Sequence, residues 1–152
     1  MYSMNGIYSI VAFLVGWTAA HIVKLLILVI KERGRASFST LVKRLLSSGG
    51  MPSGHTASLS AAVMFTGLAY GFDSPVFAIS VCILSIIIYD AINVRYAVGQ
   101  QGKVVNKLLK KVNSEDEVVK VVEGHTLLEV TVGLLLGLLM GWITYIVVVK
   151  MI

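Results

Sequence analysis

Four long apolar stretches run through this chain of 152 residues, and they constrain its fold more than any other feature. They cover about 7–30, 55–72, 76–95 and 126–149. A hydrocarbon core about 30 Å thick requires roughly 20 apolar residues in a helix, so each stretch is long enough, or nearly so, to cross a membrane. Only 14% of the residues are charged, whereas a soluble domain usually has about a quarter. The sequence therefore predicts an all-α integral membrane protein, a single domain over 1–152 with four transmembrane helices in a bundle.

Most basic residues are gathered in the two long loops between these stretches, while the N-terminal tail and the short turn around 71–75 have none. The loop residues include Lys31, Arg33, Arg35, Lys43, Arg44, Lys103, Lys107, Lys110, Lys111 and Lys120. Because cytoplasmic loops of membrane proteins are enriched in Lys and Arg, we expect both long loops in the cytoplasm and both termini outside. Basic loops would also suit an anionic substrate, which is an alternative cause of the same pattern.

The second long loop is expected to contain short amphipathic helices. Residues 103–112 place valines and leucines on one side and lysines on the other. This pattern is typical of a helix that lies on an anionic membrane surface, although packing against the bundle would produce it as well. Ser114 and Glu117 have the spacing of a capping box, which predicts a second short helix over about 115–123.

Three glycines recur at intervals of four in the last apolar stretch, at Gly133, Gly137 and Gly141. Glycines with this spacing form a smooth helix face that allows another backbone to approach closely. The partner is expected to be another helix of the bundle, and the alternative is a homodimer through the same face.

The polar residues with the clearest chemistry precede the second apolar stretch, where the chain reads Pro52-Ser53-Gly54-His55. Pro52 and Gly54 predict a tight turn, and the free N–H groups of the helix that follows would point back at it. Such a helix start binds anions, most plausibly a phosphoryl group, and His55 beside it would transfer protons near neutral pH. The alternative is ordinary helix capping by Ser53 with a structural histidine.

Polar residues at the ends of the other stretches are expected to reach the same membrane face. Lys24 lies near the end of the first stretch, Asp90, Asn93 and Arg95 close the third, and His125 opens the fourth. Ionisable groups at membrane depth are costly and usually functional. Each also has a structural alternative, because Lys24 would snorkel to the interface and Arg95 would anchor there or pair with Asp90.

Glu129 and His21 each have two interpretations. Glu129 follows Thr126 with capping-box spacing, and it also lies four residues after His125, where it would orient the histidine ring. We favour the orienting role. His21 lies one turn before Lys24, and we expect it to make a hydrogen bond inside the bundle rather than to take part in catalysis.

Together these residues resemble the membrane branch of the type 2 phosphatidic acid phosphatase and vanadium haloperoxidase superfamily. The closer resemblance is to a short, divergent bacterial and plastid-type subgroup with Gly-Gly-Met-Pro-Ser-(Ser/Gly)-His. The segment 52–55 matches fully, Lys24 fits the first motif, and His125 with Glu129 fits the last, with Glu in place of the usual Asp. The chain departs from the pattern where Lys31-Glu32 replace Arg-Pro and where thirty residues separate Arg95 from His125. It also has four expected spans instead of about six.

The resemblance implies metal-independent hydrolysis of a lipid phosphate or diphosphate, without a cofactor. His125 would attack phosphorus and form a phosphohistidine, Glu129 would orient it, and His55 would act as general acid and base. The groups that would bind the phosphoryl oxygens are Lys24, Ser53, Gly54 and Arg95, with assistance from Lys31.

Phosphatidic acid, phosphatidylglycerol phosphate and polyprenyl phosphates or diphosphates all suit such a site, at the cytoplasmic face of a bacterial plasma membrane among membrane lipids. The departures leave open a catalytically weak or inactive lipid-phosphate binding or transport module on the same scaffold. A metal site is a third class, because histidine and carboxylate side chains ligate Zn²⁺ or Mn²⁺. Its ligands would come from His21, His55, Asp90, His125 and Glu129. No nucleic-acid-binding motif is visible.

Overall fold

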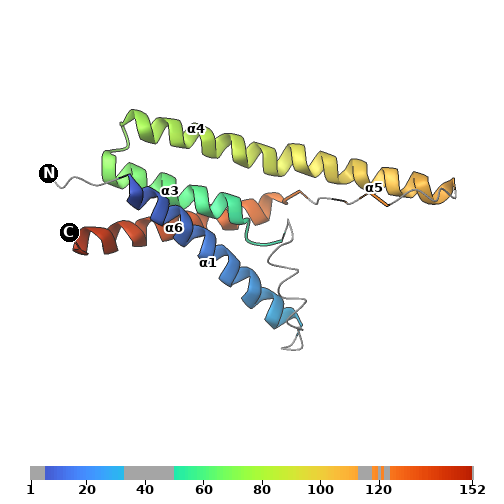
Figure 1. Ribbon diagram of the computed structural model, residues 1–152, viewed down its shortest axis with the longest axis horizontal. Coiled ribbons are helices and arrows are strands. Elements are labelled where there is room, and N and C mark those ends of the chain that lie inside the picture. Colours follow the sequence, from blue (N-terminus) through green and yellow to red (C-terminus); the bar gives the residue numbers. More distant parts are fainter. Residues whose placement is uncertain (1–5, 33–49, 113–117, 120, 122–123, 152) are drawn as a thin grey trace.

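The computed structural model describes residues 6–32, 50–112, 118–119, 121 and 124–151, and all regular structure in these ranges is helical. The described residues form three single helices and one composite rod (Figure 1). The single helices are α1 (Ile7–Lys31), α3 (Gly54–Tyr70) and α6 (Leu127–Met151). The rod consists of α4 (Pro75–Tyr89), a π-helical turn η1 (Asp90–Val94) and α5 (Arg95–Lys111). The prediction of an all-α architecture is confirmed.

The helices run alternately up and down (Figure 1). The first described residues of the chain lie at the same end of the bundle as the last ones, together with the turn between α3 and α4. The end of α1 and the starts of α3 and α6 lie at the opposite end. The end of α1 and the starts of α3 and α6, which we expected to converge, are therefore at one end of the bundle.

Three of these elements are long and apolar enough to cross a membrane, namely α1, the rod from Pro75 to Lys111, and α6. The second predicted span, 55–72, corresponds to α3, which has only 17 residues and is the most buried helix of the structure. Its buried positions are mostly alanine, serine, threonine and glycine, which suits the centre of a bundle better than contact with lipid.

Close contact between backbones holds α1, α3 and α6 together. A Cβ atom on Gly133 of α6 would lie 2.7 Å from the Ser53 carbonyl oxygen, and one on Gly137 would collide with the Ala57 carbonyl oxygen. A Cβ atom on Gly16 of α1 would lie 2.6 Å from that same Ala57 oxygen, so α1 and α6 both approach α3 at this carbonyl. The glycine face of α6 is thus covered by α3 within the chain, and a homodimer through it would need the surface that α3 occupies.

The rod differs from the prediction for the third apolar stretch. We expected the span to end near residue 95 and a separate helix to cover 103–112, but the helix continues unbroken to Lys111. No proline follows Pro75, and single glycines do not stop a helix that is otherwise rich in good helix formers. At 37 residues the rod is about 55 Å long, well beyond a 30 Å hydrocarbon core. The α5 part therefore projects past the bundle instead of lying against it (Figure 1).

Most of the second predicted loop helix, over 115–123, lies outside the described residues. Three of its residues, Val118, Val119 and Val121, are described and are not helical. The prediction is wrong at these three positions because Val119 pairs its backbone with a side chain of α5, an interaction between residues thirteen positions apart that local spacing does not reveal.

Candidate functional site at the start of α3 and α6

Ser53 caps α3 and ties it to α6. Its backbone is extended, its side chain is fully buried, and its oxygen accepts a hydrogen bond from the Thr56 hydroxyl at 3.0 Å. The Ser53 N–H donates to the Glu129 carbonyl at 3.0 Å. These contacts are those of the ordinary capping alternative, and they fix the start of α3 against the first turn of α6.

The neighbouring Gly54 is covered by a residue that the sequence did not assign to the site. A Cβ atom on Gly54 would lie 3.3 Å from Cε1 of His21, so the imidazole ring sits directly against this glycine. His21 Nδ1 lies 2.8 Å from the Trp17 carbonyl oxygen, and its ring stacks on the Trp17 indole at a centroid distance of 4.0 Å. His21 thus makes a hydrogen bond, but to a carbonyl of its own helix and not across the bundle as expected, and its position beside the motif was not foreseen. The sequence feature that could have indicated this position is the spacing of one helical turn between His21 and Lys24.

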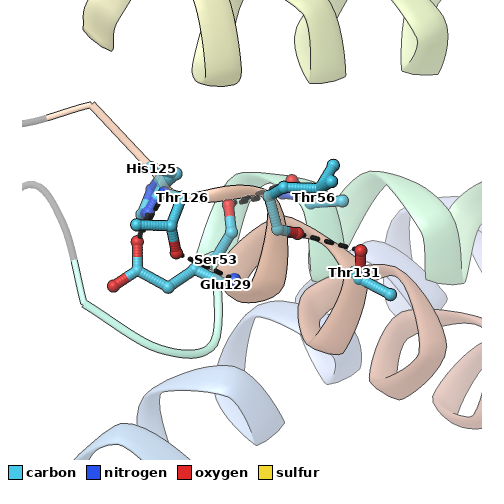
Figure 2. A network of polar contacts seen from close by, with 7 residues as sticks. Ser53, Thr56, His125, Thr126, Glu129 and Thr131 are labelled. Atoms are coloured by element: carbon cyan, nitrogen blue, oxygen red, sulfur yellow. Dashed lines mark hydrogen bonds and ion pairs between the residues drawn. The ribbon is translucent and has the colours of Figure 1, made fainter.

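His125 and Glu129 form the pair that the spacing predicted (Figure 2). His125 is 8% exposed, and its Nδ1 atom lies 3.3 Å from Oε2 of Glu129. The same carboxylate oxygen accepts the Thr126 N–H at 3.0 Å, while the Thr126 hydroxyl accepts the Glu129 N–H at 3.3 Å. This is a capping box, so both interpretations of Glu129 hold at once.

The Glu129 contact decides the protonation of the His125 ring. An ionised carboxylate only accepts hydrogen bonds, so the hydrogen must be on Nδ1. In the neutral ring Nε2 then keeps its lone pair and is the basic or nucleophilic nitrogen. The arrangement matches the carboxylate–histidine pairs that orient catalytic imidazoles.

Arg95 is paired with Asp90. Its Nε atom lies 2.6 Å from Asp90 Oδ2, and both side chains are partly exposed. The two residues are five positions apart, which in an α-helix would point them in different directions. Between them lies the π-helical turn, in which the Arg95 N–H bonds to the Asp90 carbonyl and brings the two side chains onto one face. The Asp90 alternative for Arg95 is therefore confirmed.

Two hollows are lined by most of the predicted site residues, while Ser53 and Gly54 line neither. His55, Arg95 and His125 line a small cavity of about 30 Å³ together with Asp90. Lys24 and Lys31 line a second hollow of about 110 Å³, which Glu129 borders. Lys24 is only 6% exposed, although it carries a charge.

The two hollows lie close to each other. Glu129, which borders the second hollow, contacts His125, which lines the first, at 3.3 Å. The predicted cations and histidines therefore meet at one end of the bundle, around the first turns of α3 and α6. Asn93 is exposed and lines neither hollow.

Metal ligation has little support in this geometry. Within the described residues, no group of three or more histidine, cysteine, aspartate or glutamate side chains is placed to hold a metal ion. The five residues considered as metal ligands do not form such a group in this arrangement.

Comparisons with known proteins agree with the motifs. The sequence profile of the divergent PAP2 family, where PAP2 denotes type 2 phosphatidic acid phosphatase, matches residues 7–140. A relative from Bacillus subtilis (strain 168), named uncharacterized membrane protein YuiD, is 36% identical over an alignment that covers 62% of this chain and 69% of the relative. No solved structure matches the chain. With a match over most of its length, the chain belongs to the divergent PAP2 family.

Proposed function

We propose that this protein hydrolyses a lipid phosphate or diphosphate, without a metal, at the end of the bundle where α3 and α6 begin. The observation that carries the proposal is the His125–Glu129 pair, whose ring faces a cavity shared with His55 and Arg95. A basic imidazole nitrogen, a second histidine and a cation around one cavity are the groups that phosphoryl transfer through a histidine requires.

The proposed reaction has two displacement steps. His125 Nε2 attacks phosphorus, a P–N bond forms, and the P–O bond to the lipid breaks while His55 donates a proton to the leaving oxygen. His55, now neutral, then takes a proton from a water molecule, whose oxygen attacks phosphorus and breaks the P–N bond. Phosphate leaves, and both histidines return to their starting protonation. Glu129 stabilises the positive charge that the His125 ring gains in the first step.

The cations and N–H donors stabilise the negative charge on the phosphoryl oxygens. Arg95 reaches the phosphoryl group from the histidine cavity, while Lys24 and Lys31 reach it from the neighbouring hollow. Ser53 and Gly54 contribute the start of α3. Removal of one well-placed donor of this kind costs about 2.7–4 kcal/mol of barrier in other enzymes.

The membrane arrangement that fits this site has four spans. In it α3 crosses the bilayer inside the bundle, shielded from lipid by α1 and α6, and both long loops face the cytoplasm of a bacterial plasma membrane. The substrate keeps its tail in the lipid and places its headgroup at the cytoplasmic end of the bundle. Phosphatidic acid, phosphatidylglycerol phosphate and polyprenyl phosphates and diphosphates are the candidates.

A second candidate function is a lipid-phosphate binding or transport module with weak turnover or none. Two observations favour it, namely the engagement of Arg95 by Asp90 and the division of the cations between two hollows. Both candidates bind a lipid phosphate at the same place, and only the first releases inorganic phosphate.

The test is phosphate release by the purified protein in detergent, with EDTA present, from each of the candidate lipids. We expect release from at least one lipid and its loss in His125→Ala, while Leu139→Ala, an exposed position on α6, serves as the matched control. Release at the parental rate from His125→Ala would contradict the nucleophile assignment. Binding of lipid or vanadate without release would establish the second candidate.

A further inference from the structure

Asn106, on the projecting helix α5, makes a double hydrogen bond to a distant peptide. Its Nδ2 atom donates to the Val119 carbonyl at 2.8 Å, and the Val119 N–H donates to its Oδ1 atom at 2.8 Å. A primary amide has one donor side and one acceptor side, so it matches the N–H and C=O groups of a single residue. Two bonds at once fix both the position and the orientation of Val119 on α5.

Further along the chain, described residues contact α5 progressively closer to the bundle. A Cβ atom on Gly102 would lie 3.3 Å from Cγ2 of Val121, so this valine packs on the glycine. Gly124 lies so close to the backbone at Tyr96 that a Cβ atom on it would collide with the Tyr96 N atom. The contact points therefore follow α5 back toward the candidate site.

The last contact point is the proposed nucleophile itself. The His125 N–H donates to the Ala91 carbonyl oxygen at 3.1 Å. Ala91 belongs to the π-helical turn, where the wider spacing of the backbone hydrogen bonds changes which carbonyls the helix itself uses. The main chain of His125 is thus anchored on the rod, while its ring is held by Glu129 of α6.

Only a short piece of chain joins the first and last anchors. Val119 and His125 are six residues apart, and six residues reach at most about 20–22 Å. Their anchor residues on the rod, Asn106 and Ala91, are fifteen positions apart. Because so few residues join the two anchors, the position of Val119 on α5 restricts where His125 can lie.

From this geometry we infer that Asn106 is a positioning residue for His125, and the catalytic part of this inference rests on the proposed function. The Asn106 amide fixes the position of Val119 along α5. Because a short piece of chain joins Val119 to His125, this also restricts the position of the proposed nucleophile. In the described part of the chain, the hydrogen bonds of the Asn106 amide are made to Val119 and not to a residue of the proposed site, so its effect reaches the reaction through the position of His125.

The experiment compares three variants of the full chain in detergent. Asn106→Leu removes both hydrogen bonds at similar size, and Asn106→Asp keeps the acceptor but loses the donor. Gln101→Leu, which removes an exposed amide from the same helix, is the matched control. Hydrogen–deuterium exchange is measured at the Val119 and His125 amides, together with kcat and KM for phosphate release and the midpoint of thermal unfolding.

We expect faster exchange at both amides in Asn106→Leu, with peptides of α3 and of the middle of α6 unchanged. A displacement of about 1 Å costs on the order of 100-fold in rate, so kcat should fall about 10- to 100-fold while KM changes less than about threefold. Asn106→Asp should lie between Asn106→Leu and the parent, and it keeps the test valid if the leucine variant does not fold.

The exchange result decides the inference independently of activity. Unchanged exchange at His125 in Asn106→Leu overturns it, and so does equal loss of kcat in Gln101→Leu. If exchange at His125 rises but the parent protein releases no phosphate, Asn106 does position the main chain of His125 and the phosphatase proposal fails. If the parent is active and Asn106→Leu retains its kcat despite faster exchange, Asn106 is not a positioning residue for catalysis.

Discussion

The two sides of the candidate site are held in place by different kinds of contact. On the bundle side, Lys24, Ser53 and Glu129 belong to helices whose backbones touch at glycines, so their positions follow from steric fit. On the rod side, Arg95 and the main chain of His125 depend on a π-helical turn and a few hydrogen bonds. In a close-packed interior one added methyl group is felt, whereas a partly exposed hydrogen bond has a small net effect on stability. We therefore expect bundle substitutions to affect folding and rod substitutions to affect turnover.

The largest effect should come from Gly137→Val, which breaks the bundle side. Its Cβ atom would collide with the Ala57 carbonyl oxygen, and this backbone atom in the first turn of α3 has no room to move away because Gly16 of α1 also lies against it. Overpacking costs about 1–3 kcal/mol where side chains can adjust and more where they cannot. We expect at least about 3 kcal/mol of destabilisation and little folded protein, measured as yield and thermal unfolding midpoint in detergent.

The control for this substitution is Leu139→Val, two positions further along α6 on the exposed face. It should change the free energy of unfolding by less than about 0.5 kcal/mol, as surface substitutions usually do. If Gly137→Val were as stable as Leu139→Val, the bundle would not depend on backbone contact at the glycines, and the contrast between the two sides would disappear.

A pair of variants separates the two roles of Glu129, which lies where the bundle side meets the rod side. In Glu129→Gln the amide oxygen can take the place of Oε2 and still accept hydrogen bonds from the Thr126 N–H and from His125 Nδ1, but the negative charge is lost. Without that charge, the positive charge that the His125 ring gains when Nε2 attacks phosphorus is less stabilised. We expect the rate of phosphate release to fall about 10²- to 10³-fold, the loss typical when one electrostatic stabiliser is removed.

Thr126→Ala is the other half of the pair. It removes the hydroxyl that accepts the Glu129 N–H and leaves the carboxylate–histidine contact in place. We expect a loss of about 1 kcal/mol in the free energy of unfolding and little change in rate. Equal rates for Glu129→Gln and Thr126→Ala would mean that Glu129 acts only as a cap.

Local periodicity and spacing were enough to predict much of the bundle side. The ends of α1, α3 and α6 fall within a few residues of the predicted spans, because long apolar runs with clear ends leave few alternatives. The His125–Glu129 pair was predictable for the same reason, since residues four apart on a helix are neighbours. Capping-box spacing also identified Thr126 correctly.

The rod side was less predictable because its contacts depend on tertiary structure. Nothing in the spacing of Asp90 and Arg95 indicates a π-helical turn, and the amphipathic pattern of 103–112 is equally consistent with a separate helix or with the continuation of a long one. In the sequence Asn106 falls among the lysines of that helix, where an amide is usually solvated. Its contact with Val119 joins residues thirteen positions apart, which no local pattern predicts.

The smallest effect is expected for Asp90→Asn, on the rod side. The Asp90–Arg95 pair is partly exposed, and such pairs contribute about 0–1 kcal/mol, so the free energy of unfolding should fall by no more than that.

The substitution Asp90→Asn also removes a negative charge from the wall of the histidine cavity. Of the five guanidinium donors of Arg95, only Nε is used in the Asp90 contact. An anion should therefore bind more tightly in the variant. A gain of up to 1 kcal/mol corresponds to about a fivefold lower Kd for vanadate, measured by titration in detergent. A Kd more than tenfold higher would show the opposite relation, in which Asp90 holds Arg95 in the orientation that binds the phosphoryl group, and the rod side would then depend on fixed geometry as strictly as the bundle does.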